Sequence, residues 1–166
     1  MNVDITIISD TNLELLKRII ESKSNNLIKQ VFVSPYGQLY QSIYSFKEDL
    51  KHIIFINSFP ETHIEEFNKA LNSEKINKEK LVNEVKEYAE LLISLSRKCR
   101  CILLPAWSIL YHYKSFGLMD WKSDFGICNL LNEMNYLLNL NLRDSKNIYM
   151  IDSSSWLLNN ENYRNS

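Results

Sequence analysis

Glycine, proline and cysteine are all scarce in this chain, with three of each among 166 residues. So few glycines and prolines exclude long flexible linkers and indicate long regular elements. Cys99, Cys101 and Cys128 are an odd number, which excludes a complete disulfide framework, and no histidine lies near them as a zinc site would need. The cysteines are therefore typical of reduced thiols in the cytosol.

Long apolar runs and an excess of charge of one sign are also missing. No run approaches the ~20 residues of a membrane span, and the N-terminus lacks the apolar core of a signal peptide. The formal net charge is −1 without a long run of one sign, which excludes the concentrated basic patch that binds nucleic acids and membrane surfaces. We therefore expect a cytoplasmic protein that binds neither nucleic acids nor membranes.

The remaining composition is that of an ordinary globular domain, with 45% hydrophobic and 23% charged residues. A chain of this length fits a single compact domain. We expect that domain to cover residues 1–158. The asparagine-rich segment NNENYRNS, residues 159–166, is expected to be a frayed or truncated tail.

Five short runs rich in β-branched and aromatic residues alternate with stretches of helical periodicity. The strands are expected at Val3–Ser9, Ile28–Ser34, His52–Asn57, Cys101–Trp107 and Asn147–Asp152. The helices are expected at Thr11 to about Lys23, Gln38 to about Leu50, Pro60–Leu71, Glu74–Lys98 and Phe125–Leu140. This alternation predicts right-handed crossovers and an α/β fold whose parallel sheet is covered on both sides.

Two of these helices carry an apolar face. In the first helix the face consists of Leu15, Leu16, Ile19 and Ile20. In the long helix apolar residues recur at spacings of four and three, at Leu81, Val85, Tyr88, Leu92 and Leu95. Such a stripe predicts the side that packs on the sheet, although a partner helix could use the same face.

Ligands of open α/β sheets bind beyond the carboxyl ends of the strands, near the point where the strand order reverses. Polar or turn-forming residues follow all five expected strands, at Ser9–Asn12, Ser34–Gln38, Asn57–Ser58, Pro105–Ser108 and Asp152–Ser155. Polar loops are common in all proteins, so this pattern indicates a location for a site and no particular chemistry.

Several of these positions resemble the motif blocks of the SGNH/GDSL hydrolases. The sequence has S-D-T at 9–11, Gly37 after the second strand, Asn57 after the third, and NEMNYLLN (132–139) before the fifth. In that family a G-D-S-type block after the first strand carries the serine nucleophile. The resemblance implies a three-layer α/β/α sandwich, flavodoxin-like or SGNH-like, with a five-stranded parallel sheet in the order 2-1-3-4-5.

A closer resemblance, over essentially the whole chain, is to the SGNH-like N-terminal domain of FkbH-type proteins. It rests on the segments SPYGQLYQSI (34–43), LPAWSILYHYKSFGLMD (104–120) and GICNLLNEMNYLL (126–138). Those proteins are associated with loading glyceryl units onto acyl carrier proteins, and their next domain is a phosphatase-like HAD domain, whose D-x-D-x-T loop is absent here. The resemblance implies a small acyl or glyceryl ligand, and an acyl carrier protein or an HAD phosphatase-like domain as partner.

The catalytic residues of the hydrolases are matched incompletely. Thr11 stands at the position of the serine nucleophile, where its methyl group crowds the approach to an acyl carbon, and Ser9 offers a second hydroxyl two residues earlier. A triad also needs a base and a group that orients the base. Asp152 is followed by Ser155 where the family's D-x-x-H block has its histidine.

The three histidines of the chain offer no evident base. His52 opens a strand at the end away from the site, and His63 falls in the first turn of a helix. His112, in the loop after the fourth strand, is the one histidine whose position would allow it to reach the strand ends, but we do not expect it to act as the base. The sequence therefore predicts a hydrolase-like site without its catalytic base, and neither a metal nor another cofactor is expected there.

The same loops also match the starts of capped helices. Thr11-Asn12-Leu13-Glu14 and Ser58-Phe59-Pro60-Glu61 fit the capping box, in which a hydroxyl accepts from a backbone N–H and the glutamate reaches back. Two helix N-termini that meet at one crevice would also direct free N–H groups at an anion or oxyanion. A cap alone, a cap that also binds a ligand, and a nucleophile block all remain open for Thr11.

Two functions follow from these residues. The first is a binding or scaffold domain without hydrolysis, and the second is an esterase or acyltransferase that uses Thr11 or Ser9. In both cases Asp10, Gly37 and Asn57 are expected to form the binding or oxyanion site. The surrounding pocket is expected to include Tyr36, Gln38, Ser58, Trp107 and Asp152. Asn135, which shares a helix face with Asn132, is expected on the surface or supporting the loop after the fifth strand.

Overall fold

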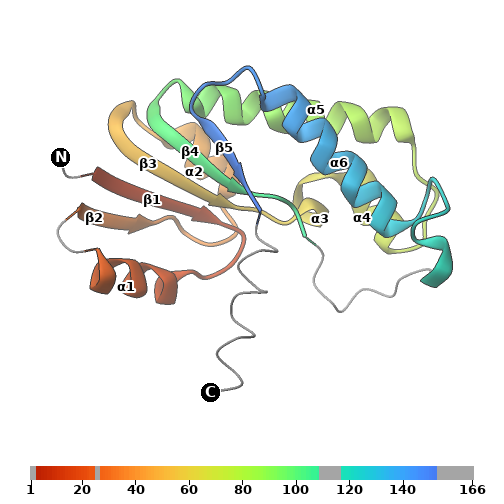
Figure 1. Ribbon diagram of the computed structural model, residues 1–166, viewed down its shortest axis with the longest axis horizontal. Helices are drawn as coiled ribbons and strands as arrows, with labels where there is room; N and C mark the ends of the chain where they lie inside the picture. The colour runs from red at the N-terminus through yellow and green to blue at the C-terminus, as the bar shows by residue number, and fades with distance from the viewer. Residues whose placement is uncertain (1–2, 25–26, 109–116, 153–166) are drawn as a thin grey trace.

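The computed structural model describes residues 3–24, 27–108 and 117–152 (Figure 1). Its strands are β1 (Val3–Ser9), β2 (Ile28–Val33), β3 (Asp49–Asn57), β4 (Cys99–Pro105) and β5 (Ile148–Ile151). Its helices are α1 (Glu14–Lys23), α2 (Leu39–Ser45), α3 (Pro60–His63), α4 (Glu65–Leu71), α5 (Lys78–Ser96) and α6 (Ile127–Leu142), with the 3-10 turn η1 (Gly117–Met119) before α6. Within these ranges no helix is both long and apolar enough to cross a lipid bilayer.

The five strands form one parallel sheet in the order β2-β1-β3-β4-β5, which confirms the fold class expected from the sequence. The chain runs from β1 to β2 and then passes β1 to reach β3, so the strand order reverses between β1 and β3. Ser9 and Asn57 pair in register at the carboxyl ends of these two strands. The reversal therefore brings the loops after β1 and β3 together, where ligands of such sheets bind.

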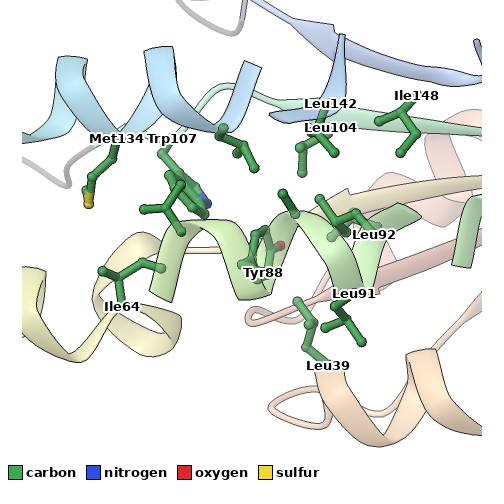
Figure 2. Packing of buried hydrophobic residues seen from close by; sticks show 14 of the residues in the cluster. Leu39, Ile64, Tyr88, Leu91, Leu92, Leu104, Trp107, Met134, Leu142 and Ile148 are labelled. Carbon is green, nitrogen blue, oxygen red and sulfur yellow. The ribbon is translucent and has the colours of Figure 1, made fainter. Parts of the chain in front are cut away.

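The main core lies between the sheet and helices α2, α4, α5 and α6. Ile54 and Ile56 of β3 point into it, because alternate residues of a strand face the same side of a sheet. All five members of the apolar stripe expected on the long helix are buried, from Leu81 to Leu95. Figure 2 shows α5 residues of this core among residues of α2, β4 and α6. The stripe is therefore the face packed on the sheet.

The opposite face of the sheet carries α1, which is the one helix on that side in the described ranges (Figure 1). The cavity between α1 and the sheet measures about 190 Å³ and is lined by Ile5, Leu16, Ile20, Ile53, Phe55 and Leu103. Leu15 is 70% exposed and Ile19 is also exposed. Half of the apolar face expected for the first helix is therefore solvent-facing, because α1 packs mainly on the edge strand β2.

Two expected helix boundaries are wrong. The second helix ends at Ser45, where Phe46 takes an extended conformation (φ −62°, ψ 120°), and β3 already begins at Asp49. The expected helix Pro60–Leu71 is broken at Ile64 (φ −114°, ψ 98°) into α3 and α4. Ile64 is fully buried in the main core. Burial of this side chain accounts for the break, which sequence periodicity did not indicate.

Candidate functional site

A polar cavity of about 460 Å³ opens at the carboxyl ends of β1 and β2, beside the point of strand reversal. The loop after β1, the loop after β2, and helices α2 and α3 supply its wall. The lining residues are Asp10, Tyr36, Gly37, Gln38, Leu39, Tyr40, Gln41, Thr62 and His63. Gly37 has a positive φ of 73°, a conformation that favours glycine. Four of the residues expected at a site (Asp10, Tyr36, Gly37 and Gln38) therefore lie around one cavity.

The hydroxyl of Ser9 is fully occupied inside the protein. Its Oγ accepts hydrogen bonds from the backbone N–H of Thr11 (3.0 Å) and from Nδ2 of Asn57 (3.2 Å), and it lies 3.1 Å from Oγ1 of Thr11. A hydroxyl has one proton and two lone pairs, so the proton of Ser9 is left for Thr11. Ser9 is 2% exposed. The hydrogen bond between Ser9 and Asn57 holds the end of β1 against the end of β3. The amide of Asn57, which was expected in an oxyanion hole, is therefore already bonded to Ser9.

The carboxylate of Asp10 joins the loop after β1 to the segment after β3. Its Oδ2 accepts from the backbone N–H of Phe59 (2.9 Å), from Oγ1 of Thr62 (2.8 Å) and from Nε2 of His63 (2.7 Å). Burial by itself would raise the pKa of Asp10, but the hydrogen bonds from His63, Phe59 and Thr62 and the nearby His63 ring outweigh it. The pKa of Asp10 is therefore held below its ordinary value, and the carboxylate is ionised at neutral pH.

His63 is the site residue that sequence reasoning missed. Its side chain is 4% exposed, and its ring lies edge-on to Tyr40 (5.2 Å between centroids) and stacked on Tyr88 (5.5 Å). Because the carboxylate of Asp10 can only accept, Nε2 of His63 carries a proton. Nδ1 is buried and has no hydrogen-bond partner in the described part of the chain. A usable signal was the position of His63 in the first turn of the helix expected after β3, because that turn lies close to the strand ends.

Both expected capping boxes are wrong. The backbone N–H of Glu14 is bonded by Oδ1 of Asn12, while the hydroxyl of Thr11 is engaged by Ser9. At the start of α3 the N–H of Phe59 is bonded by Asp10. A local bond from Asn12 replaces the expected cap at α1, whereas at α3 the loop after β1 supplies the acceptor through Asp10. The N–H of Phe59 is therefore not free for an anion.

Ser58 and Trp107, which were expected in the pocket, belong to the core instead. Trp107 is 3% exposed, and its Nε1 donates to Oγ of Ser58 (3.1 Å), which also bonds the hydroxyl of Tyr88 (2.7 Å). Figure 2 shows Tyr88 and Trp107 within this packed region. Asn135 bonds both the backbone N–H and the backbone oxygen of Trp107, each at 2.9 Å. Asn135 therefore supports the loop after β4, and the fifth-strand loop expected for it was the wrong one.

Of the remaining expected residues, Asp152 is described and does not line this cavity. Asp152 is exposed after β5, three strand positions from β1, which corresponds to roughly 14 Å at the spacing of neighbouring strands. The expected pocket around Asp152 is wrong because β1 and β5 are not neighbours. His112 and Ser155 lie outside the described residues.

The geometry offers a binding cavity and no assembled nucleophile–base pair. Nε2 of His63 is bonded to Asp10, and the hydroxyl of Thr11 is bonded to Ser9. Within the described ranges, the hydroxyl hydrogen-bonded to a histidine is that of Thr6, which meets His52 near the amino ends of the strands. The same ranges contain no group of three histidine, cysteine or acidic residues that could hold a metal ion.

Comparison with known proteins gives one informative structural match. No family model matches the sequence, and no curated protein matches it significantly. The fold is similar to the N-terminal part of the protein BF1531 from Bacteroides fragilis, a crystal structure containing a phosphatase domain complexed with Mg. The TM-score is 0.67 at 16% sequence identity, and the match covers 93% of this chain and 41% of that one. The likeness concerns the fold, and this chain corresponds to about two fifths of its neighbour's length.

Proposed function

We propose that this chain is an SGNH-like domain of the FkbH type that binds a small acyl or glyceryl group and does not hydrolyse it. The observation that carries the proposal is that the hydroxyl of Ser9 is buried and already hydrogen-bonded within the protein. Ser9 belongs to the segment 9–11 that resembles the nucleophile block of the hydrolases. Its Oγ accepts hydrogen bonds from the N–H of Thr11 and the amide of Asn57. Beside it, the 460 Å³ cavity remains open to a ligand.

The charge of the cavity favours a neutral group over a phosphorylated one. Asp10 is ionised, and no lysine or arginine is among the lining residues. Gln38, Gln41 and Tyr36 supply uncharged donors and acceptors that suit hydroxyl and carbonyl oxygens. A glyceryl or short acyl group fits this chemistry, whereas a phosphate would meet a carboxylate without a compensating cation.

The partner in this proposal is an acyl carrier protein or an HAD phosphatase-like domain. The structural neighbour from Bacteroides fragilis contains a phosphatase domain and is more than twice as long as the matched part. This supports a role beside a second domain, with residues 1–158 acting as one SGNH-like unit.

An esterase or acyltransferase that uses Thr11 is the second candidate. Thr11 is more exposed than Ser9 and directly follows Asp10, which lines the cavity. Thr11 lacks a bonded base among the described residues, which is why binding without turnover is the preferred function.

The test uses the glyceryl thioester of N-acetylcysteamine, titrated into the ¹⁵N-labelled protein and followed by NMR. Saturable shifts at Asp10, Gly37 and Gln38 are expected. Tyr36→Ala should weaken binding at least about fivefold, because an exposed aromatic wall of the cavity is lost. Tyr136→Ala is the matched control, since Tyr136 is exposed on α6 outside the cavity. Shifts that fail to saturate, or an equal effect of both variants, would refute the proposed site.

A further inference from the structure

A second, smaller cavity adjoins the first on the side of α5. It measures about 160 Å³ and is lined by Tyr40, Tyr44, His63, Glu84, Glu87, Tyr88 and Leu91. Tyr40 and His63 line both cavities. The two spaces therefore lie on either side of a shared wall formed by these two residues.

The second cavity is negatively charged. Two carboxylates line it, and no lysine or arginine is among its lining residues. Both carboxylate oxygens of Glu84 already have partners. Oε2 accepts from the backbone N–H of Glu66 (3.0 Å), and Oε1 lies 3.5 Å from Nζ of Lys80. Glu87 is exposed and has no ion pair in the described part of the chain. Glu87 is thus the anionic group left for a ligand.

The acidic side chains around the second cavity also affect the pKa of Tyr40. Burial raises the pKa of Tyr40, and the neighbouring Tyr44, Asp10, Glu84 and Glu87 raise it further. Burial disfavours a charge of either sign, but the carboxylates of Asp10, Glu84 and Glu87 that add to the shift would also attract a positive charge. The effect of these carboxylates on Tyr40 agrees with the cation site that the lining residues of the cavity indicate.

Aromatic rings make up most of the remaining wall. Tyr40 and Tyr44 are both exposed on α2, one helical turn apart, and face the buried Tyr88 of α5 across the cavity. Tyrosine rings attract an ammonium group through their negative faces, and a nearby carboxylate adds to the attraction. Rings and a free carboxylate together are a recognition site for a cation of this kind.

His63, a residue of the shared wall, also carries a nitrogen that is unpartnered within the described ranges. Its side chain is 4% exposed, and its Nδ1 has no partner among the described residues. Since Nε2 carries the proton given to Asp10, Nδ1 presents a lone pair that needs a donor. An ammonium group has three N–H donors and no acceptor, so it complements this wall.

We propose that the second cavity binds a protonated amine, so that the ligand of this domain is an aminoacyl group with its acyl carbon in the first cavity. The inference rests on the proposed function, because it names the class of acyl group that the same site takes. Glu87 and the rings of Tyr40 and Tyr44 hold the amine.

The test compares three N-acetylcysteamine thioesters of similar length: 3-aminopropanoyl, 3-hydroxypropanoyl and malonyl. At pH 7 the first carries a cation, the second is neutral and the third is an anion. The amine should bind at least about fivefold more tightly than the alcohol, and malonyl should bind most weakly. Glu87→Gln should abolish the preference for the amine. Glu90→Gln, a change at an exposed glutamate one turn further along α5, should leave it intact.

The outcomes separate this inference from the function on which it rests. Equal affinities for the amine and the alcohol, or a preference that survives Glu87→Gln, would overturn the amine site while leaving an acyl-binding domain. Binding of none of the three thioesters would overturn both.

Discussion

At the end of β1, Ser9 turns its hydroxyl toward Asn57 while Asp10 turns its carboxylate toward the segment that follows β3. Both side chains fasten the first strand to the third at the point where the strand order reverses. The sequence indicated that polar residues would gather here. It did not indicate that the hydroxyl of Ser9 would be hydrogen-bonded within the protein, because one of its partners, Asn57, lies 48 residues away in the sequence.

The role of Ser9 can be measured as stability. Ser9→Ala would leave the buried N–H of Thr11 and the amide of Asn57 without their acceptor. We expect the free energy of unfolding in urea to fall by about 2 kcal/mol. Ser22→Ala, at an exposed serine of α1, should change it by less than about 0.5 kcal/mol. An unchanged midpoint for Ser9→Ala would contradict the structural role.

The buried, hydrogen-bonded carboxylate of Asp10 predicts a pH dependence of stability. Because the folded pKa of Asp10 lies below the ordinary value of 3.8, the carboxylate stabilises the fold above about pH 4 and loses this effect as pH falls further. Asp10→Asn should cost about 2 kcal/mol at pH 7, since hydrogen bonds to a charged acceptor are weakened. The gap to wild type should shrink in denaturation curves recorded below pH 4.

A matched control for this dependence is Asp144→Asn, because Asp144 is almost fully exposed. Its unfolding free energy should follow that of the wild-type protein at every pH. A gap for Asp10→Asn that is equally large at pH 7 and pH 3 would mean that the charge of Asp10 does not stabilise the fold.

Helix positions followed from periodicity, but helix ends did not. The stripe on α5 is correct because burial against a sheet requires apolar residues every three or four positions. The expected caps failed because the hydroxyl of Thr11 is bonded to Ser9 in the same loop and that of Ser58 is bonded to Tyr88 of α5. The same competition explains His63, whose ring is placed by the break at Ile64 and by Asp10.

Asn135 shows how one helix positions a neighbouring loop. Its amide bonds the N–H and the oxygen of Trp107, so α6 holds the chain where it leaves β4. Asn135→Ala should lower the free energy of unfolding by about 2 kcal/mol through two lost hydrogen bonds. Asn132→Ala, on the exposed side of the same helix, should have an effect below about 0.5 kcal/mol. Equal effects of the two variants would place Asn135 on the surface, as one interpretation of the sequence had it.

For the whole molecule, the alternation of strands and helices was enough to predict the parallel sheet, and the family resemblance gave its order. That order also fixes which loops can meet. It joins the ends of β1, β2 and β3 around the cavity and keeps Asp152 at the far edge of the sheet. Thr11 and Asp152, two positions of the hydrolase pattern, therefore follow strands that are not neighbours in this sheet.

The central claim is that the cavity binds an acyl group without cleaving it. The most direct measurement is the rate of cleavage of the glyceryl thioester at saturating concentration, for wild type, Ser9→Ala and Thr11→Val. The account predicts that all three rates equal the rate in buffer while the wild-type protein binds the ligand. Cleavage by the wild type faster than in buffer would contradict it, and loss of that cleavage in Thr11→Val would identify the hydroxyl of Thr11 as the nucleophile.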